Sequence, residues 1–291
     1  MNYIEYKNKQ KKKENNRLFN ESKIKETFIK RLTQKGFSTT LFELNCHTLN
    51  FIVCRSFPND EEAMYDLFTN NILVKKRNYI DCIWHELLHA SSTLRTDNMV
   101  YSGLSVIDEN CERIGTGLNE GVTVLLDEML FKGITKNHDE ISDTYVVEKF
   151  LCSILYDILG NFLFKCYFAA DFYTFYAYLV DFNGFKKTDK FIKAFDKICF
   201  ENYYSDDSEN PNIKGIAASF NYICFYLLEL AIKHIVRNYE TGYIDNQTYK
   251  EGIKGCLDYF SKVCVKDEND KIYEIDKEKI KRIIKKNISK C

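Results

Sequence analysis

Proline is scarce in this chain, and its scarcity constrains the fold more than any other feature of the sequence. Only 2 Pro and 12 Gly occur among 291 residues. Because proline disrupts helix interiors and glycine weakens them, a chain with so few of both forms long helices easily. The 22 Phe and 20 Tyr are too many aromatic residues for a solvated coil. We therefore expect a folded and mostly helical protein.

Apolar residues recur at helical spacing along most of the chain. The helices expected in the N-terminal half cover residues 60–67, 77–92 and 118–131. Asp60 is the expected N-cap of the first of them. Those expected in the C-terminal half cover residues 143–159, 171–182, 191–198, 217–238 and 246–260, with a last helix from about 276. Lysines surround the isoleucine stripe of that last helix, which is typical of a core-facing helix with a solvated basic face. A helix for a membrane surface or an acidic partner is the alternative.

Strand signals are confined to the N-terminal half. Short apolar runs at 41–44 and 49–53 predict strands. Residues 100–114 predict a hairpin in which a first strand over 100–106 is followed by a turn at 108–110. The expected fold class is therefore mostly α with a small β-sheet or hairpin, that is, α+β.

The chain divides by composition into three parts. Residues 1–20 form a polar, basic tail, which we expect to be frayed; a basic arm for an acidic partner is the alternative. Residues 21–135 contain the β structure and form a core, and residues 136–291 form a helical subdomain packed on it. An aromatic-rich stretch at 167–176 is expected in the core of this subdomain, although it could line a substrate cleft.

Charge and cysteine usage narrow the class of protein. Lys+Arg 41 against Asp+Glu 42 gives a net charge of -1, which argues against a nucleic-acid partner. The 11 Cys include no CxxC pair and lie in apolar contexts, as is typical of reduced thiols in the cytosol. We find no secretory signal and no uninterrupted apolar run of about 20 residues. We expect a soluble, cytoplasmic protein with no membrane span.

Two of the five histidines frame a motif with a defined chemical use. Residues 85–89 read His85-Glu86-Leu-Leu-His89, an HExxH motif inside the helix expected over 77–92. Residues four apart share one helix face, so both imidazoles can bind one Zn²⁺ at about 2.0–2.1 Å. Glu86 is not a ligand in such a site, and its carboxylate can accept a proton from the attacking water. The alternative is two ordinary surface histidines on a helix.

A catalytic zinc usually has three protein ligands and one open position. Glu120 follows the expected hairpin at the start of the helix over 118–131, where it can point across to the HExxH helix. Gly121 beside it would let these two helices approach closely. We therefore expect Glu120 as third ligand, with complementarity to the helix dipole as its alternative role. The remaining histidines lie in no motif: His47, His138 and His234.

An HExxH motif followed by an Asn-Glu-Gly helix resembles the gluzincin group of zinc metallopeptidases. The resemblance covers residues 84 to about 126 and implies a zincin-like catalytic core within 21–135. It implies that His85, His89 and Glu120 bind one Zn²⁺ per chain and that Glu86 activates water for peptide hydrolysis. Membership of the metzincins is excluded, because Ser92 and Arg95 occupy the positions at which that pattern requires Gly and His.

The chain also departs from the family pattern. Thermolysin-like members carry an Asp four residues after the ligand Glu, where this chain has Val124; Thr123 or Asp127 could take its role. The Gly-x-Met-x-Asn element of related aminopeptidases is absent, so an endopeptidase is favoured. Tyr101, in the expected hairpin, is our candidate for stabilising the oxyanion. The edge of that hairpin is expected to pair with an extended peptide or protein substrate.

Three functions stay open on the sequence. The first is a zinc metallopeptidase that acts on peptides or on a specific protein. The second is a catalytically silent zincin-fold protein that binds a partner and keeps a structural zinc. Cys82 lies nearly one helical turn before His85 and is a possible extra ligand of such a zinc. The intact Glu86 argues against this second function. The third, regulation by cleavage of a repressor, is compatible with a cytosolic HExxH protein. The substrate and the oligomeric state stay open.

Overall fold

A computed structural model of the chain describes residues 21–54, 62–75, 80–133, 144–204, 212–267 and 270–288. Helices predominate in these residues, and the strands form three small sheets. The expected fold class, mostly α with small β-sheets, is confirmed. The basic tail at 1–20 lies outside the described residues, so its role stays a prediction.

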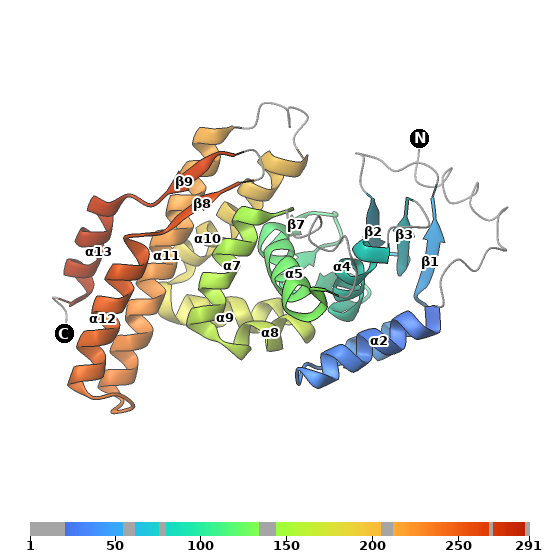
Figure 1. Ribbon diagram of the computed structural model, residues 1–291, viewed down its shortest axis with the longest axis horizontal. Helices are drawn as coiled ribbons and strands as arrows, with labels where there is room; N and C mark the ends of the chain where they lie inside the picture. The colour runs from blue at the N-terminus through green and yellow to red at the C-terminus, as the bar shows by residue number, and fades with distance from the viewer. Residues whose placement is uncertain are drawn as a thin grey trace.

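The helices of the N-terminal half surround its strands. They are α2 (Glu21–Gln34), α3 (Thr40–Cys46), α4 (Ile80–Ser91) and α5 (Thr116–Phe131). The helices of the C-terminal half are α7 (Val146–Leu159), α8 (Asn161–Phe168), α9 (Phe172–Asn183), α10 (Phe185–Cys199), α11 (Ile213–Glu240), α12 (Asn246–Phe260) and α13 (Lys277–Ile288), and a π-helical turn at Phe200–Tyr204 follows α10. Figure 1 shows α4 and α5 in the middle of the molecule, with α2 and a sheet at one end and α12 and α13 at the other.

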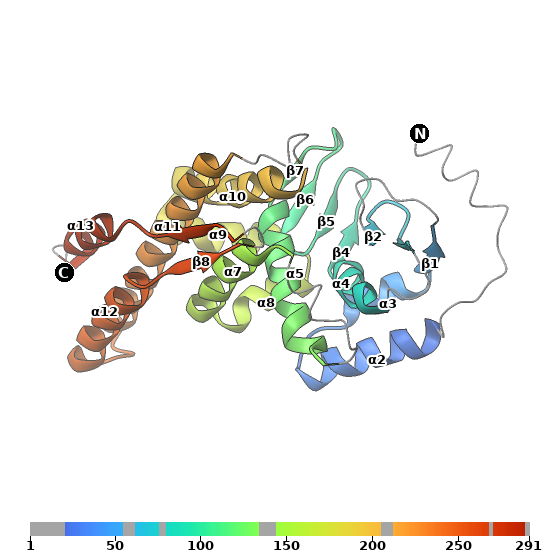
Figure 2. The ribbon, with the colours of Figure 1, turned by 45° about the horizontal axis from the view of Figure 1, so that its top comes forward.

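The strands pair mostly with neighbours in sequence. The first sheet has the order β1-β3-β2, with β1 (Asn50–Val53) parallel to β3 (Asn71–Val74) and β2 (Ala63–Asp66) antiparallel to it. The second sheet is an antiparallel meander of β4 (Thr93–Arg95), β5 (Val100–Ser102), β6 (Ser105–Ile107) and β7 (Arg113–Ile114). The third pairs β8 (Cys264–Lys266) with β9 (Ile272–Glu274) and was not expected from the sequence. Figure 2 shows the meander beside α5.

Two expectations for the N-terminal half are wrong. Residues 41–44 lie in α3 and form no strand; Phe42 is buried against Phe28, whereas Leu44 is exposed, so the run has one inward-facing side chain. The expected helix over 60–67 is replaced by β2, because pairing with β3 and burial of Tyr65 override the local helical signal. Asp60, its expected N-cap, lies outside the described residues.

The other expected elements are confirmed with small changes. Helices α4, α5, α7, α9, α11, α12 and α13 lie where the spacing predicts them, while α10 begins earlier than expected. The cap of α12 is Asp245, whose side chain accepts a hydrogen bond from the Thr248 N–H. The expected first strand of the hairpin is divided into β5 and β6 by a turn at Gly103, which has φ 55°. The last helix packs its Ile280 on the core, as the core-facing interpretation predicts.

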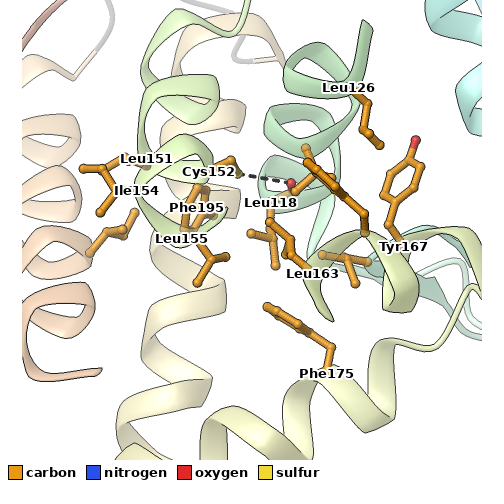
Figure 3. Packing of buried hydrophobic residues seen from close by; sticks show 14 of the residues in the cluster. Leu118, Leu126, Leu151, Cys152, Ile154, Leu155, Leu163, Tyr167, Phe175 and Phe195 are labelled. Carbon is orange, nitrogen blue, oxygen red and sulfur yellow. Dashed lines mark hydrogen bonds between the residues drawn. The ribbon is translucent and has the colours of Figure 1, made fainter. Parts of the chain in front are cut away.

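One hydrophobic cluster joins both halves of the chain. It extends from Phe28 in α2 to Ile280 in α13 without a break at the expected boundary after residue 135. In Figure 3, Leu118 and Leu126 of α5 lie among apolar side chains of α7, α8 and α10, including Cys152, Leu163 and Phe195. Helix α5 thus lies at the centre of this packing. The division into a core and a helical subdomain itself stays a prediction.

Among the described residues, α11 is long and apolar enough to cross a membrane by length and composition. Within the fold, 67% of its most apolar window is buried. A core helix of a soluble protein meets the same criteria, so this finding is weak evidence for a span.

Candidate metal centre

Helix α4 presents the HExxH motif from a buried position. Ile83, Leu87 and Leu88 are almost fully buried on its apolar side. Trp84 stacks on Phe131 of α5, with ring centroids 4.9 Å apart. This packing fixes the helix, so the three polar side chains of the motif are held in place with little exposure to solvent. His85, Glu86 and His89 are each 8% exposed.

The two histidines and Glu120 point at one another. The Nε2 atoms of His85 and His89 lie 3.0 Å apart. Each of them is 3.3 Å from Oε2 of Glu120. In the described part of the chain, these three side chains form the group of His, Cys, Asp or Glu residues that could hold a metal ion. The sequence thus predicted all three members of the cluster.

The spacing of these three atoms suits a small metal ion. Ligand atoms about 2.0–2.1 Å from a tetrahedral zinc ion lie about 3.3–3.4 Å from one another. The separations of 3.0, 3.3 and 3.3 Å are close to that value. Two imidazoles and one carboxylate also match the donors that zinc takes, whereas calcium and magnesium favour oxygen alone. The site therefore fits a divalent transition metal.

The charges of the cluster depend on one another. Burial lowers the pKa of His85, but the hydrogen bond to Glu120 and the nearby carboxylates outweigh it and raise the pKa to about 9. Burial raises the pKa of Glu120, but the two histidines more than offset this and hold it well below its usual range. Without a bound cation, a proton on His85 would balance the charge of the Glu120 carboxylate. A divalent cation would take over that role and displace the proton.

Glu86 lies beside the cluster and faces the edge strand β2. Burial raises the pKa of its carboxyl group, although the two histidines oppose the rise. The backbone N–H of Tyr65 in β2 donates a hydrogen bond to this carboxylate. Glu86 is therefore held between the HExxH helix and the sheet, in an environment that favours its uptake of a proton.

Asn119 is a site residue to which the sequence analysis gave no role. Its side-chain nitrogen lies 3.3 Å from Nδ1 of His89, and its Oδ1 accepts a hydrogen bond from the Leu104 N–H at 3.0 Å. It is 3% exposed, so the side chain links the β5–β6 turn to the imidazole. The only signal for it in the sequence was its place directly before Glu120.

The remaining interactions that could orient the two histidines differ from the family pattern. Nδ1 of His85 is buried and has no hydrogen-bond partner in the described part of the chain. Asp127 acts on His85 through its charge, which contributes to the raised pKa. The Thr123 hydroxyl donates to the Asn119 carbonyl and pairs with the Tyr167 hydroxyl, and the Val124 side chain is buried. Of the two expected substitutes, Asp127 is thus the one that influences a ligand.

The expected close approach at Gly121 involves a different helix. A Cβ atom at Gly121 would lie 2.8 Å from the Glu148 carbonyl oxygen and from Sγ of Cys152, both in α7. The glycine therefore lets α5 approach α7, not the HExxH helix. The expectation was wrong because α5 has neighbours on several sides, and Gly121 faces away from α4.

The structure does not place Tyr101 in the cluster. Its hydroxyl hydrogen-bonds Sδ of Met99 at 3.1 Å, and its ring contacts Tyr173. Tyr167 lies nearer to the cluster. The charges of Glu120 and Glu86 add to the effect of burial in raising the pKa of its hydroxyl, and the side chain is fully buried. The role of Tyr101 as oxyanion stabiliser stays a prediction.

Cys82 and the remaining histidines lie outside the cluster. The Cys82 thiol lies 3.7 Å from Oε2 of Glu62. His47 is exposed, and His234 pairs with the Tyr178 hydroxyl at 3.0 Å. His138 lies outside the described residues.

Comparisons with protein-family models, with curated proteins and with solved structures find no significant match for this chain. The functional argument therefore depends on the HExxH sequence and on the geometry of the cluster.

Proposed function

We propose that this protein is a zinc metallopeptidase of the gluzincin type, and an endopeptidase. The observation that carries the proposal is the convergence of three ligand atoms, 3.0–3.3 Å apart, directly beside the Glu86 carboxylate. His85, His89 and Glu120 would hold one zinc ion. A bound zinc ion supplies a Lewis acid that polarises the peptide carbonyl and increases the acidity of water.

Glu86 performs the proton transfers in this proposal. Its carboxylate accepts the proton of the attacking water and returns it to the leaving amine. Burial raises the pKa of Glu86, which brings it closer to that of a group that exchanges protons near neutral pH. The low exposure of the surrounding side chains limits competing water, which strengthens the electrostatic interactions.

The substrate of the proposed enzyme is an extended peptide or protein segment. The meander β4–β7 ends in the edge strands β4 and β7, and we expect such a segment to pair with an edge of this sheet, as proposed from the sequence. Strand β2 offers a second edge, because it pairs with β3 on one side and its Tyr65 amide faces Glu86. A segment added beside β2 would therefore pass close to the catalytic carboxylate.

A silent protein with a structural zinc is the alternative proposal. Structural zinc sites are usually closed by four protein ligands, often including Cys. The cluster has three members in the described part of the chain, and Cys82 is not one of them. This open arrangement favours the enzyme over the alternative.

The first test is the zinc content of protein purified without chelators or an affinity metal. We expect about one zinc per chain in the wild type and none in His85→Ala or Glu120→Ala. His47→Ala, at an exposed histidine, and Glu128→Ala, whose carboxylate in α5 pairs with Lys132 and Lys149, are the matched controls and should keep the metal. Absence of zinc after supplementation contradicts the proposal.

Activity is tested separately with a peptide library. The wild type should cleave internal bonds, and Glu86→Gln should bind zinc but lose cleavage by a factor of about 10²–10⁴, as expected for loss of a general base. Zinc binding without cleavage of any peptide would favour the silent alternative.

A further inference from the structure

Helix α5, which carries Glu120, begins without a cap of its own. Its N-cap is Gly115, with φ 84°, and no side chain at that position accepts a hydrogen bond from the helix. The first turn of a helix has backbone N–H groups without partners inside the helix, and an uncapped first turn frays. Glu120 lies just beyond this turn, so fraying there would move a metal ligand.

A carboxylate from the distant helix α10 takes the place of the cap. Asp196 Oδ2 accepts a hydrogen bond from the Gly115 N–H at 2.9 Å, and Oδ1 accepts one from the Gly117 N–H at 3.0 Å. The Thr116 N–H also donates to this carboxylate. Burial raises the pKa of Asp196 although these amides oppose the rise, and no basic side chain contributes. In the described part of the chain, the hydrogen bonds of the Asp196 carboxylate thus go to the start of α5.

Gly117 brings the same turn into direct contact with α10. A Cβ atom there would collide with the backbone carbonyl group of Phe195 and would lie 2.9 Å from Cβ of Cys199. The absence of a side chain therefore lets the Asp196 carboxylate reach the amides of α5. Two independent features, a glycine on one helix and a carboxylate on the other, hold this turn in place.

We propose that Asp196 is a positioning residue of the metal centre, which fixes the first turn of α5 and thereby sets the place of Glu120 opposite His85 and His89. This inference rests on the metal binding in the proposed function, not on peptidase activity. Glu120 lies three positions after Gly117, which is less than one helical turn, so a shift of the turn passes to the ligand. Metal–ligand distances tolerate deviations of about 0.2 Å. The helical half of the chain would thus determine the metal affinity of a site formed by the other half.

Asp196→Asn is the direct test. The asparagine has the same shape but keeps one acceptor oxygen and turns an NH₂ group toward an N–H of α5. We expect the dissociation constant for Zn²⁺, measured by competition with a chromophoric chelator, to rise about tenfold, the lower end of the range for groups that orient ligands. The absorption spectrum of the Co²⁺-loaded protein should change as well, which a purely structural role would not cause in folded protein.

The matched control is Asp171→Asn. Asp171 caps α9, and only its Oδ1 accepts a bond, from the Thr174 N–H at 3.0 Å, so asparagine can replace it. Metal affinity and the cobalt spectrum should not change in this variant. The inference is overturned if Asp196→Asn folds and its zinc affinity and cobalt spectrum are unchanged. In that case the proposed function still stands as long as the wild type binds zinc. A wild type that binds no metal overturns both.

Gly117→Ala keeps the inference testable if Asp196→Asn does not fold. The added methyl group forces α5 away from Phe195 while Asp196 is intact, so we expect a similar loss of zinc affinity. Gly255→Ala is its control, because a Cβ atom at that position in α12 meets no atom within 4 Å. Equal zinc affinity in the two glycine variants contradicts a positioning role of the α5–α10 contact.

Discussion

The two helices that supply the proposed metal ligands differ in how they are held. In α4 the ligands His85 and His89 lie one turn apart, so helical periodicity alone places them together. In α5 a single ligand, Glu120, depends on contacts with distant parts of the chain. These contacts are Asp196 of α10, the backbone of α7 at Gly121, and the β5–β6 turn at Asn119. One helix thus carries a local motif, and the other carries a ligand placed by tertiary packing.

This difference implies that the centre fails in two ways. Substitutions in α4 should remove ligands and leave the fold intact. Substitutions at the contacts of α5 leave every ligand in the chain, and they should weaken metal binding by moving a ligand or by destabilising the fold. Measurements of stability and of zinc affinity on the same variant separate these two outcomes.

Gly121→Ala should have the largest effect on stability. Its methyl group would lie 2.8 Å from the Glu148 carbonyl oxygen and from the Cys152 thiol, so α5 and α7 must separate. Such overpacking costs about 1–3 kcal/mol. We expect the free energy of unfolding of the metal-free protein, measured in urea, to fall by that amount, and zinc affinity to fall as well. Gly255→Ala is the control, since its added methyl group meets open space. If both alanine variants unfold alike, Gly121 does not mediate the close approach.

Asn119→Ala should weaken metal binding more than it affects the fold. It removes the contact with Nδ1 of His89 and the acceptor for the Leu104 N–H. Groups that orient a ligand typically contribute about 10–100-fold to metal affinity. Chelator competition measures the loss.

Asn221→Ala is the matched control for Asn119→Ala. The Oδ1 of Asn221 accepts a hydrogen bond from the Asp276 N–H at 2.9 Å, far from the centre. Unfolding of the two variants should be similar, while zinc affinity should differ. Equal zinc affinities would mean that Asn119 only supports the turn.

The contrast between the two helices also explains what could be predicted from the sequence. The HExxH motif identified His85, Glu86 and His89, because spacing along one helix fixes their geometry. Glu120 was identified from its place after the hairpin and from family resemblance. Asn119, Asp196 and the partner of Gly121 were not, because their roles arise from contacts between residues up to 81 positions apart.

The same reasoning applies to the fold. The helices of the C-terminal half are long and periodic, so their positions followed from apolar spacing. The region before α4 was harder, because its elements are short and are determined by pairing. Strand β2 exists because β3 is beside it, and α3 exists because Phe42 packs on Phe28. Local propensity predicted the opposite secondary structure for both.

Zinc affinity should depend on pH, because the charged groups of α4 and α5 act on each other. Glu120 of α5 contributes to raising the pKa of His85 of α4 to about 9, so below that pH a proton must leave before the metal binds. We expect the dissociation constant for zinc to rise about tenfold for each pH unit between 8 and 6. Titration at three pH values measures this slope. A dissociation constant that is independent of pH, after correction for the chelator, contradicts the coupling between the two helices.

The smallest effect is expected far from the centre, at Glu229 in α11. Burial raises the pKa of its carboxyl group, but Lys187 and Lys233, at 2.6 and 3.0 Å, more than offset it and lower the pKa. A lowered pKa in the folded state stabilises the protein above the unfolded value of 4.5, and this stabilisation is lost as the pH falls through the folded value. Because these ion pairs are partly solvated, we expect Glu229→Gln to cost about 0.5–1 kcal/mol at pH 7 and less at pH 3. Urea unfolding at both pH values measures this cost. The control is Glu240→Gln, at an exposed glutamate near the end of the same helix.

The zinc affinity of Glu229→Gln should be unchanged at pH 7, since this ion pair touches neither α4 nor α5. A change there would show that the helical half acts on the centre through more than the contacts of α5.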